Sequence, residues 1–472
     1  MPAMRNAQRT GTPGNDGRPG PPVVADLPGR YHPVSGAGRL YDWLFLDLNS
    51  YFASVEQQER PETRGRPTVV VPVMSEHTCA IAASYEAKAL GIKTGTGIRE
   101  ALAKCPDLIR VLARHDLYVD YHHRIVEEVE RFMPVTQVAS VDEMACRLSG
   151  RLRGRDEALA LARRIKAGLA ARIGGHLRCS IGISTNRYLA KVATDLEKPD
   201  GLVALHADDL PGPLLGLGLT DFPGISGNME RRLNRAGIRS TRDLWNCSAK
   251  RLRAAWGSVG GERFWYALRG IEIPEDETRR STVGHSHVLD PDQRPPRLAE
   301  HVGRRLLLKA AGRLRAMDYQ ASELTLTVRL ETGGRHESGA RFPALSDSIT
   351  LQEAFTAVWT QLLGQSGEAR IKKVGVTLHR LSPASGDQQL DLFEQPDDPD
   401  APPPHAHARR ARLSRAIDTI TDQFGRDAVT VGIVPGQGSS FTGTKIAFTR
   451  IPGRGEFESQ RDQRRPQRPP TP

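Results

Sequence analysis

The stretch YDWLFLDLNSYFASVE, residues 41–56, places an apolar strand directly before an amphipathic helix. The strand part ends on an aspartate, Asp47, and the following part has the spacing of a helix that Asn49 or Ser50 can cap. An acid at the end of an apolar core strand is costly unless it is paired or binds a metal ion. This stretch therefore predicts both a core strand and a first candidate functional residue.

A pair of acids interrupts another apolar stretch. Asp142 and Glu143 lie between the runs 137–141 and 144–148, both of which predict strands. An isolated acidic pair is most often an ordinary surface turn. Three acids on two core strands of a basic protein instead favour a divalent-metal site, because magnesium prefers carboxylate oxygens and shares its shell with substrate phosphates. Adjacent strand residues point to opposite faces, so joint use of both acids requires a turn or bulge.

The composition excludes several classes of protein. The 472 residues carry 66 basic and 55 acidic side chains, and the net charge of +11 indicates a polyanionic partner such as nucleic acid. Five scattered cysteines without a CxxC pair argue against a disulfide framework and a structural zinc site. No run approaches the roughly 18 apolar residues of a membrane span, and the first residues lack the apolar region of a secretory signal.

The order of patterns along the chain predicts several domains. Strands and helices alternate from about residue 40 to 210, which indicates an α+β core. Residues 211–278 have a helical texture around a tight turn at 222–227. Residues 279–384 follow the order β-α-β-β-α-β, the ferredoxin-like split motif, with the third strand expected near 340–350. This last domain holds a large share of the chain's excess basic charge.

The remaining segments lack such periodicity. Residues 1–40 are dense in glycine and proline and are expected to form a disordered extension. Residues 385–410 are acidic and proline-rich and predict a linker. A small organised segment is expected over 411–452, followed by an Arg/Pro-rich disordered tail over 453–472.

An ordered set of segments resembles the Y-family DNA polymerases, the bacterial translesion group that includes DNA polymerase IV and the catalytic subunit of DNA polymerase V. The segments are residues 47–56, Ser140-Val141-Asp142-Glu143, residues 180–191 and Lys198-Pro199-Asp200-Gly201. The resemblance extends from about residue 41 to 393. It implies an error-prone DNA-directed DNA polymerase that performs translesion synthesis in DNA repair, by nucleotidyl transfer from a dNTP to a primer 3′-hydroxyl.

The same resemblance implies a multidomain α+β fold, the right-handed polymerase. A ferredoxin-like palm would comprise residues 41–56 and 116–210, with small fingers at 57–115. A helical thumb with a helix-hairpin-helix would comprise 211–278. The basic little finger, 279–384, would contact duplex DNA through its phosphates without reading sequence.

Roles at the palm follow from the matching positions. Asp47, Asp142 and Glu143 would hold two Mg²⁺ ions, with a contribution from the Leu48 carbonyl. One ion would lower the pKa of the primer 3′-hydroxyl, and the other would bind the triphosphate and the leaving pyrophosphate. Phe52 matches the steric gate, where an aromatic ring would collide with a ribose 2′-hydroxyl. Taken from its spacing alone, Phe52 is instead a core aromatic on a helix face.

Other positions match sites that bind the incoming nucleotide. The resemblance assigns this role to Tyr51, Tyr85, Lys88 and Lys198. Lys88 stands where many family members have arginine, and lysine is a point charge that holds phosphate in a looser geometry. The sequence around Lys88, residues 84–91, is closer to that of the polymerase V subunit. Whether the chain belongs to the polymerase IV or the polymerase V subgroup therefore stays open.

Two further segments match contacts with DNA and with a protein partner. Gly224, Ile225 and Gly227 lie in a turn before a helix, where backbone N–H groups can approach a DNA phosphate, although a plain interhelical turn is equally compatible. The peptide Gln389-Leu390-Asp391-Leu392-Phe393 resembles the one by which bacterial polymerases dock on the sliding clamp. The segment 411–452 resembles the small C-terminal domain of polymerase V-type proteins.

The implied partners are primed template DNA, dNTPs and the sliding clamp, with no membrane partner. The implied protein is a cytoplasmic monomer associated with the bacterial nucleoid. One alternative is a non-catalytic clamp- and DNA-binding adaptor of the same family, but such a relative would lose the metal acids, which are all present here. A nucleotidyl cyclase would also pair acids on a ferredoxin-like core, yet it has no use for a thumb hairpin, a basic little finger or a clamp peptide.

Overall fold

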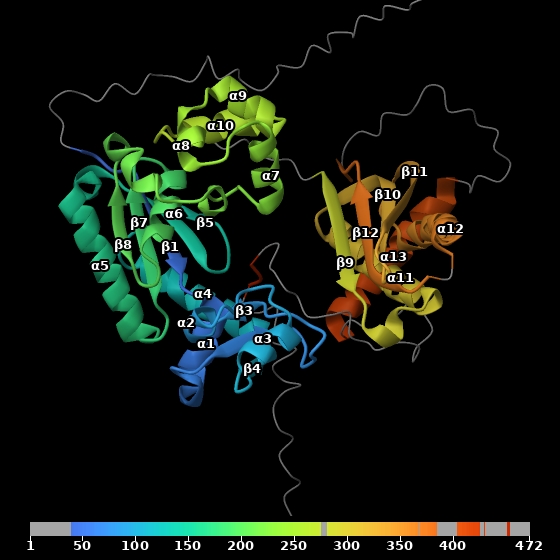
Figure 1. Cartoon of the computed structure of the whole chain (residues 1–472). Coiled ribbons are helices and arrows are strands. Elements are labelled where there is room, and N and C mark those ends of the chain that lie inside the picture. The colour runs from blue at the N-terminus through green and yellow to red at the C-terminus, as the bar shows by residue number, and fades with distance from the viewer. Residues whose placement is uncertain are drawn as a thin grey trace, which may run out of the picture. The chain divides into compact units, whose positions relative to one another are not determined.

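The computed structural model describes residues 39–274, 281–367, 369–384, 404–424, 429 and 451–453 (Figure 1). The chain divides into two compact units, residues 1–54 with 120–273 and residues 55–119 with 274–472. The predicted extension 1–40, linker 385–410 and tail 453–472 fall largely outside the described residues. The clamp peptide, residues 389–393, falls entirely outside them.

The first unit is built on a five-stranded sheet whose central strand is β1 (Trp43–Leu48), and all six residues of β1 are buried. The strand order is β5-β6-β1-β7-β8, with β5 at Gln137–Val138, β6 at Glu143–Arg147, β7 at Cys179–Ser184 and β8 at Leu202–Leu205 (Figure 1). Because β1 lies antiparallel between β6 and β7, the first four strands in this order have the ferredoxin-like arrangement. The predicted palm fold is confirmed.

Four helices accompany this sheet: α1 (Tyr51–Glu59), α4 (His115–Glu130), α5 (Arg155–Arg172) and α6 (Arg187–Leu196). Helix α6 approaches the sheet closely, because an added Cβ on Gly182 of β7 would lie 2.0 Å from the Ala190 carbonyl oxygen. Trp43 and Phe45 of β1 pack with Ala190, so alternate β1 residues face α6. The same alternation points Asp47 toward this helix.

A small helical thumb follows in the same unit, with α7 at Gly227–Arg235, α8 at Thr241–Asn246, α9 at Ala249–Trp256 and α10 at Val259–Ala267. Leu189 and Val192 of α6 share one apolar core with Phe222 and Phe264 of the thumb. The side-chain amide of Asn186 also donates to two carbonyls at the end of the thumb, those of Ala267 at 2.8 Å and Ile271 at 2.9 Å. The thumb is therefore fixed to the palm helix that carries Lys191.

Residues 55–119 of the second unit form a small sheet of order β3-β2-β4, with β2 at Thr68–Val71, β3 at Ala82–Ala83 and β4 at Ile109–Leu112. Helices α2 (Tyr85–Ala89) and α3 (Ile98–Lys104) supply apolar side chains to its core. The buried Glu56 carboxylate accepts hydrogen bonds from Arg114 at 2.5 Å and from the Tyr118 hydroxyl at 2.7 Å. These contacts join the two ends of the segment predicted as fingers.

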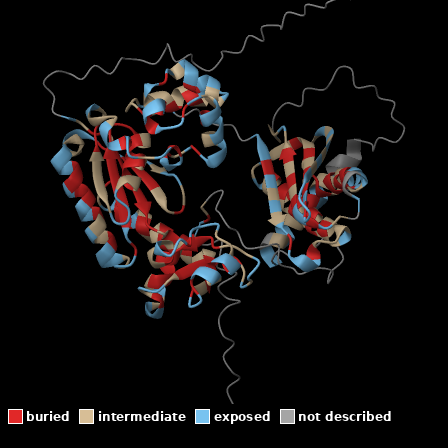
Figure 2. Ribbon diagram, viewed as in Figure 1, coloured by how far each residue is buried: buried red, intermediate tan, exposed pale blue. Residues whose placement is uncertain are grey.

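The little finger has the predicted order, with β9 at Thr282–Val288, α11 at Pro296–Ala316, β10 at Tyr319–Leu330, β11 at Arg335–Leu345, α12 at Ser348–Ser366 and β12 at Ile371–His379. Its sheet has the order β11-β10-β12-β9, and the short β13 (Ser382–Pro383) pairs with β10. The two helices pack on one face, so buried and accessible residues alternate along the strands (Figure 2).

One strand differs from the sequence prediction. The third strand was expected near 340–350, but β11 begins at Arg335 and ends at Leu345. The reason is the tight hairpin at Gly333 and Gly334, whose φ angles of +99° and +89° favour glycine and start the return strand at once.

A final helix, α13 (Pro404–Phe424), begins inside the stretch predicted as linker. It is anchored to the little finger by polar contacts. The Arg315 guanidinium donates to both carboxylate oxygens of Asp418, at 2.6 and 2.7 Å, and the Ser348 N–H donates to Ser414 Oγ at 3.0 Å. Within the described part of the chain, no helix is long and apolar enough to cross a lipid bilayer.

Candidate active site

Two of the three predicted acids lie opposite each other on neighbouring strands. In the antiparallel pair β1–β6, Asp47 is the register partner of Glu143, so both side chains lie on the sheet face that α6 covers. Asp47 is 6% exposed. Carboxylates directly opposite each other repel, so this position needs cations nearby.

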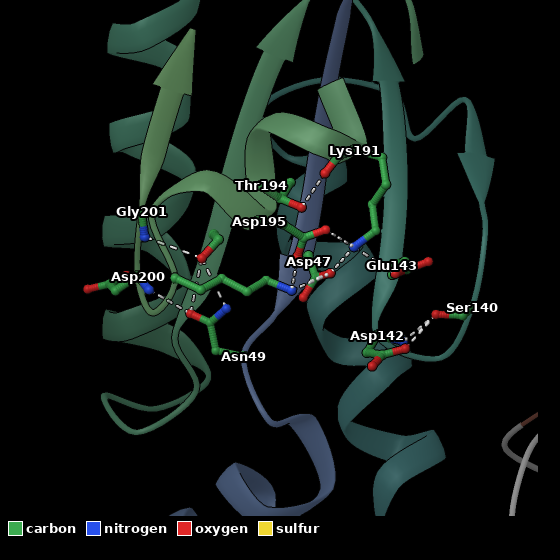
Figure 3. Close-up of polar contacts among 12 residues, drawn as sticks. Asp47, Asn49, Ser140, Asp142, Glu143, Lys191, Thr194, Asp195, Asp200 and Gly201 are labelled. Atoms are coloured by element: carbon green, nitrogen blue, oxygen red, sulfur yellow. Dashed lines mark hydrogen bonds and ion pairs between the residues drawn. The ribbon is translucent and has the colours of Figure 1, made fainter. Parts of the chain in front are cut away.

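The third acid, Asp142, lies in a bend just before β6. The bend is closed by the N–H groups of Ala139 and Ser140, which donate to the Glu143 carbonyl at 2.9 and 3.1 Å. The Leu48 N–H donates to the Asp142 carbonyl at 2.9 Å, which holds the bend against the end of β1. The bend is the irregularity that joint use of adjacent acids requires, and Figure 3 shows Glu143 near Asp47 and Asp142 beside Ser140.

The environment disfavours the charged forms of Asp142 and Glu143. Burial raises the pKa of Asp142, and the nearby Asp47 carboxylate raises it further, while the hydroxyl of Ser140, which donates to Asp142 Oδ1 at 2.5 Å, lowers it. Burial also raises the pKa of Glu143, against the opposing effect of Lys191. The acids are therefore strained electrostatically and suited to a cationic ligand.

Two lysines contact these acids, and Figure 3 shows Lys191 between Asp47 and Glu143. Lys191 of α6 contacts Asp47 Oδ2 and lies 3.0 Å from Glu143 Oε1. Lys198, just beyond α6, lies 2.9 Å from the same Asp47 oxygen. Asp195 joins both ammonium groups, at 3.6 Å from Lys191 and 2.6 Å from Lys198. Burial alone would lower the pKa of either lysine, but the surrounding carboxylates, with Asp47 first, raise both.

The donor set fits hard divalent cations. Asp47, Asp142 and Glu143 offer only carboxylate oxygens, the ligands that magnesium prefers, and they lie near the end of β1, in the bend before β6 and at the start of β6. In the described ranges, however, no three His, Cys, Asp or Glu side chains converge closely enough to hold an ion as they stand. Lys191 lies between Asp47 and Glu143 instead. The assignment of these acids as metal ligands, with the Leu48 carbonyl, therefore stays a prediction.

A loop that carries Lys198 is fastened to the strand that carries Asp47. The side chain of Asn49 accepts from the Asp200 N–H at 2.7 Å and donates to Ser180 Oγ at 3.0 Å, and Ser180 Oγ accepts from the Gly201 N–H at 3.2 Å. Lys166 of α5 pairs with the Asp200 carboxylate at 2.8 Å. The expected capping role of Asn49 gives way to this contact between the strand end and the loop.

A buried histidine supports the acidic bend from below. His122 of α4 is 2% exposed, and its Nδ1 lies 2.8 Å from the Val141 carbonyl oxygen. Since a carbonyl can only accept, Nδ1 carries the proton. Burial lowers the pKa of His122, the hydrogen bond to Val141 raises it, and the charge of the nearby His123 lowers it. Val141 directly precedes Asp142, so this hydrogen bond fixes the backbone that presents the acid.

The sequence signals for these supporting residues are weak. A lysine and an aspartate four residues apart, as Lys191 and Asp195 are, normally indicate a surface ion pair on a helix. His122 lies on a helix and is easily taken for an ordinary core residue. Gly182 in the middle of a strand is the one usable signal, because it indicates a close backbone approach over the acids.

The predicted nucleotide-contacting residues fall in both units. Phe52 is half-buried and Tyr51 is 3% exposed, and their ring centroids lie 5.7 Å apart. The greater accessibility of Phe52 makes it the better candidate for a steric gate. Tyr85 and Lys88 belong to the second unit, on α2, where the Lys88 ammonium lies 4.5 Å from the Tyr85 ring centroid. Their nucleotide-binding roles stay predictions.

The predicted hairpin of the thumb takes the expected form. Gly224 has φ +95°, Gly227 begins α7, and the Tyr188 hydroxyl donates to the Pro223 carbonyl at 3.2 Å. The Ile225 side chain is 3% exposed and its N–H donates to the Phe222 carbonyl, and the predicted phosphate contacts of Gly224, Ile225 and Gly227 stay predictions. A pocket of about 420 Å³ separates this turn from α6, where Lys191 and Asp195 line it.

Three family models match the chain. One described as the impB/mucB/samB family matches residues 46–195, and one described as the C-terminal domain of that family matches residues 280–392. A model described as the thumb domain of DNA polymerase-iota matches residues 220–272. The matches cover the palm with the fingers, the thumb and the little finger.

Whole-chain comparisons agree with these matches. DNA polymerase IV of Moorella thermoacetica is 32% identical over 393 residues, which cover 82% of this chain and 94% of that protein. Among solved structures, the Y-family DNA polymerase chimera Dbh-Dpo4(243-245)-Dbh aligns with a TM-score of 0.61 at 23% identity, over 72% of this chain and 99% of that one. The chain therefore belongs to the Y family of DNA polymerases, the translesion enzymes that include DNA polymerase IV.

Proposed function

We propose that this chain extends a DNA primer across damaged template, using Asp47, Asp142 and Glu143 as the ligands of two Mg²⁺ ions. Members of the family generally use divalent metal ions. The observation that carries the proposal is the pairing of Asp47 with Glu143 across β1 and β6, with Asp142 on the bend beside them.

The reaction is the transfer of a nucleotide from a dNTP to the primer 3′-hydroxyl. When bound, the metal ions supply a lowered pKa for that hydroxyl and charge neutralisation for the triphosphate and the leaving pyrophosphate. The three carboxylates and the Leu48 carbonyl would hold the ions. The chain positions groups and neutralises charge, and forms no covalent bond with the substrate.

Lys198 and Lys191 supply further positive charge where the phosphates would lie. Both are held near Asp47, and the loop of Lys198 is fixed by Asn49 and Lys166. Tyr85 and Lys88 would complete the triphosphate contacts from the fingers. Phe52 would exclude ribonucleotides by collision with the 2′-hydroxyl.

The grip on DNA is assigned to the thumb turn and the open face of the little-finger sheet. In the register of β10, Arg329 pairs with Arg335 on one side and Lys373 on the other, which forms a basic row across three strands. The acids on this face are engaged by arginines, since Glu323 lies 3.1 Å from Arg341. A basic row of this kind binds phosphates and does not specify sequence.

The decisive experiment is primer extension with Mg²⁺ and dNTPs. The variants Asp142→Ala and Glu143→Ala should each abolish extension and leave primed-DNA affinity nearly unchanged, because affinity comes mainly from lysine and arginine contacts with phosphates. Asp156→Asn, an exposed palm acid on α5, is the matched control. Substantial primer extension by a protein that carries both Asp142→Ala and Glu143→Ala would refute the assignment of these acids as metal ligands. DNA binding without extension by the unaltered protein would indicate the adaptor.

We also propose that residues Gln389 to Phe393 bind the bacterial sliding clamp. We propose that the chain acts as a monomer in the cytoplasm, associated with the nucleoid, and that the clamp tethers it to primed DNA. Tethering converts rebinding into an intramolecular event, with effective concentrations on the order of millimolar for a short linker. Substituting both Leu392 and Phe393 with alanine should remove clamp stimulation and leave extension on bare primed DNA unchanged. Clamp stimulation that survives this change would exclude the peptide as the docking segment.

A further inference from the structure

Both active-site lysines contact one and the same oxygen of a predicted metal ligand. Asp47 Oδ2 accepts from Lys191 and lies 2.9 Å from Lys198. Both side chains are largely buried: taken without the backbone, the Asp47 side chain is 8% exposed and the Lys191 side chain is 16% exposed. A metal ion that binds Asp47 through this oxygen must therefore compete with two ammonium groups.

Asp195 offers the same two lysines another partner. Its Oδ1 lies 2.6 Å from Lys198 and its Oδ2 lies 3.6 Å from Lys191, so each ammonium already touches one oxygen of Asp195. Asp195 lies one helical turn after Lys191 on α6 and three residues before Lys198. Neither lysine has to cross the site to exchange Asp47 for Asp195.

The charges favour such an exchange. The carboxylates of Asp47, Asp142, Glu143 and Asp195 against the ammonium groups of Lys191 and Lys198 leave about two negative charges in this cluster at neutral pH. One divalent ion neutralises that excess. Once an ion binds Asp47, repulsion between the ion and the ammonium groups moves both lysines toward Asp195.

We propose that Lys191 and Lys198 are exchangeable counter-ions of the metal site, and that Asp195 is the positioning residue that receives them when a divalent ion binds Asp47. This inference rests on the proposed metal function of Asp47. It gives Asp195 a role separate from that of the metal ligands. It also places both ammonium groups beside the bound ions, where an incoming triphosphate carries its negative charge.

The test uses Mn²⁺ alone as the probe, with the full chain and no DNA, and measures free Mn²⁺ by electron paramagnetic resonance. Lys191→Gln should bind Mn²⁺ about tenfold more tightly, because one competing charge within a few ångströms is gone. Asp195→Asn should bind it several-fold more weakly, because the lysines stay on Asp47. Opposite directions are expected from two neighbouring substitutions, which a general loss of structure cannot produce.

A double-substitution cycle isolates the role of Asp195. In a chain with both Lys191→Gln and Lys198→Gln, adding Asp195→Asn should change Mn²⁺ affinity by less than about twofold. An equal loss in both backgrounds would overturn the proposal, because Asp195 would then be a ligand or a general source of negative charge. Unchanged or weaker binding by Lys191→Gln would overturn it as well. If that variant unfolds, Lys191→Met keeps the buried stem and carries the same expectation.

Controls separate this inference from the proposed function. Lys250→Gln and Asp156→Asn remove exposed charges from the thumb and palm, and neither should alter Mn²⁺ affinity beyond about twofold. Asp47→Asn should abolish tight binding. If Asp47→Asn keeps full affinity, the proposed metal site fails. If Asp47→Asn loses it and Lys191→Gln shows no gain, only the counter-ion proposal fails.

Discussion

Replacing His122 by leucine tests whether its hydrogen bond to Val141 positions the bend that carries Asp142. The imidazole is 2% exposed and donates to the Val141 carbonyl at 2.8 Å. Leucine fills a similar volume but leaves that carbonyl unpaired, which costs about 1–3 kcal/mol. This is less than the typical 5–15 kcal/mol of a domain, so the protein should still fold. A displacement of about 1 Å at Asp142 should nevertheless lower kcat by roughly a hundredfold.

The assay is steady-state primer extension, with thermal unfolding measured on the same samples. His122→Asn is the conservative variant, because its amide can donate from nearly the position of Nδ1. It should restore most of kcat, and the Mg²⁺ concentration for half-maximal rate should rise only in the leucine variant. A leucine variant that melts earlier but keeps kcat within about twofold would show that His122 serves stability alone. Equal losses in both variants would also refute the hydrogen-bond argument.

Three further predictions address the gate, the loop and the acids. Phe52→Ala should admit ribonucleotides at least tenfold more readily in single-nucleotide incorporation, whereas unchanged discrimination would make Phe52 a packing residue. Lys166→Met should raise the KM for dNTPs several-fold with a smaller effect on kcat, because the loop of Lys198 loses its contacts with α5; an unaltered KM would contradict this. Burial raises the folded-state pKa of Asp142, so its ionisation opposes folding at neutral pH. Asp142→Asn should therefore raise the melting temperature of the metal-free protein near pH 7. The increase should shrink as the pH falls through the raised pKa of Asp142. A difference in melting temperature that does not depend on pH would count against the charge explanation.

The three candidate acids could be predicted from the sequence because acids stand out within apolar runs. The cost of burying Asp47 or Asp142 does not depend on knowing the fold, so a pattern at a single strand end is already informative. Their pairing was not accessible in the same way. It depends on the register of β1 with β6, and a shift by one residue would place Glu143 on the other face.

The supporting residues escaped sequence reasoning for a different reason. Lys191 belongs to α6, whose residues are all buried or half-buried, and the closeness of α6 to β7 brings its ammonium group to Asp47. Asn49 was expected to cap α1, but its side chain binds Asp200 on a loop far along the chain. Such long-range contacts leave no periodicity in the sequence.

The connection between Asn49 and Asp200 has a consequence for how the site works. The strand end that carries Asp47 and the loop that carries Lys198 are joined by three hydrogen bonds through Asn49 and Ser180. A metal ion on Asp47 and a phosphate on Lys198 would thus be held by one rigid group of residues rather than by two elements that move independently. Pre-organisation of this kind lowers the entropy cost of aligning the reacting atoms. It also explains why polar residues such as Asn49 and Ser180 occupy buried positions, since their hydrogen bonds connect the end of β1, strand β7 and the loop of Lys198.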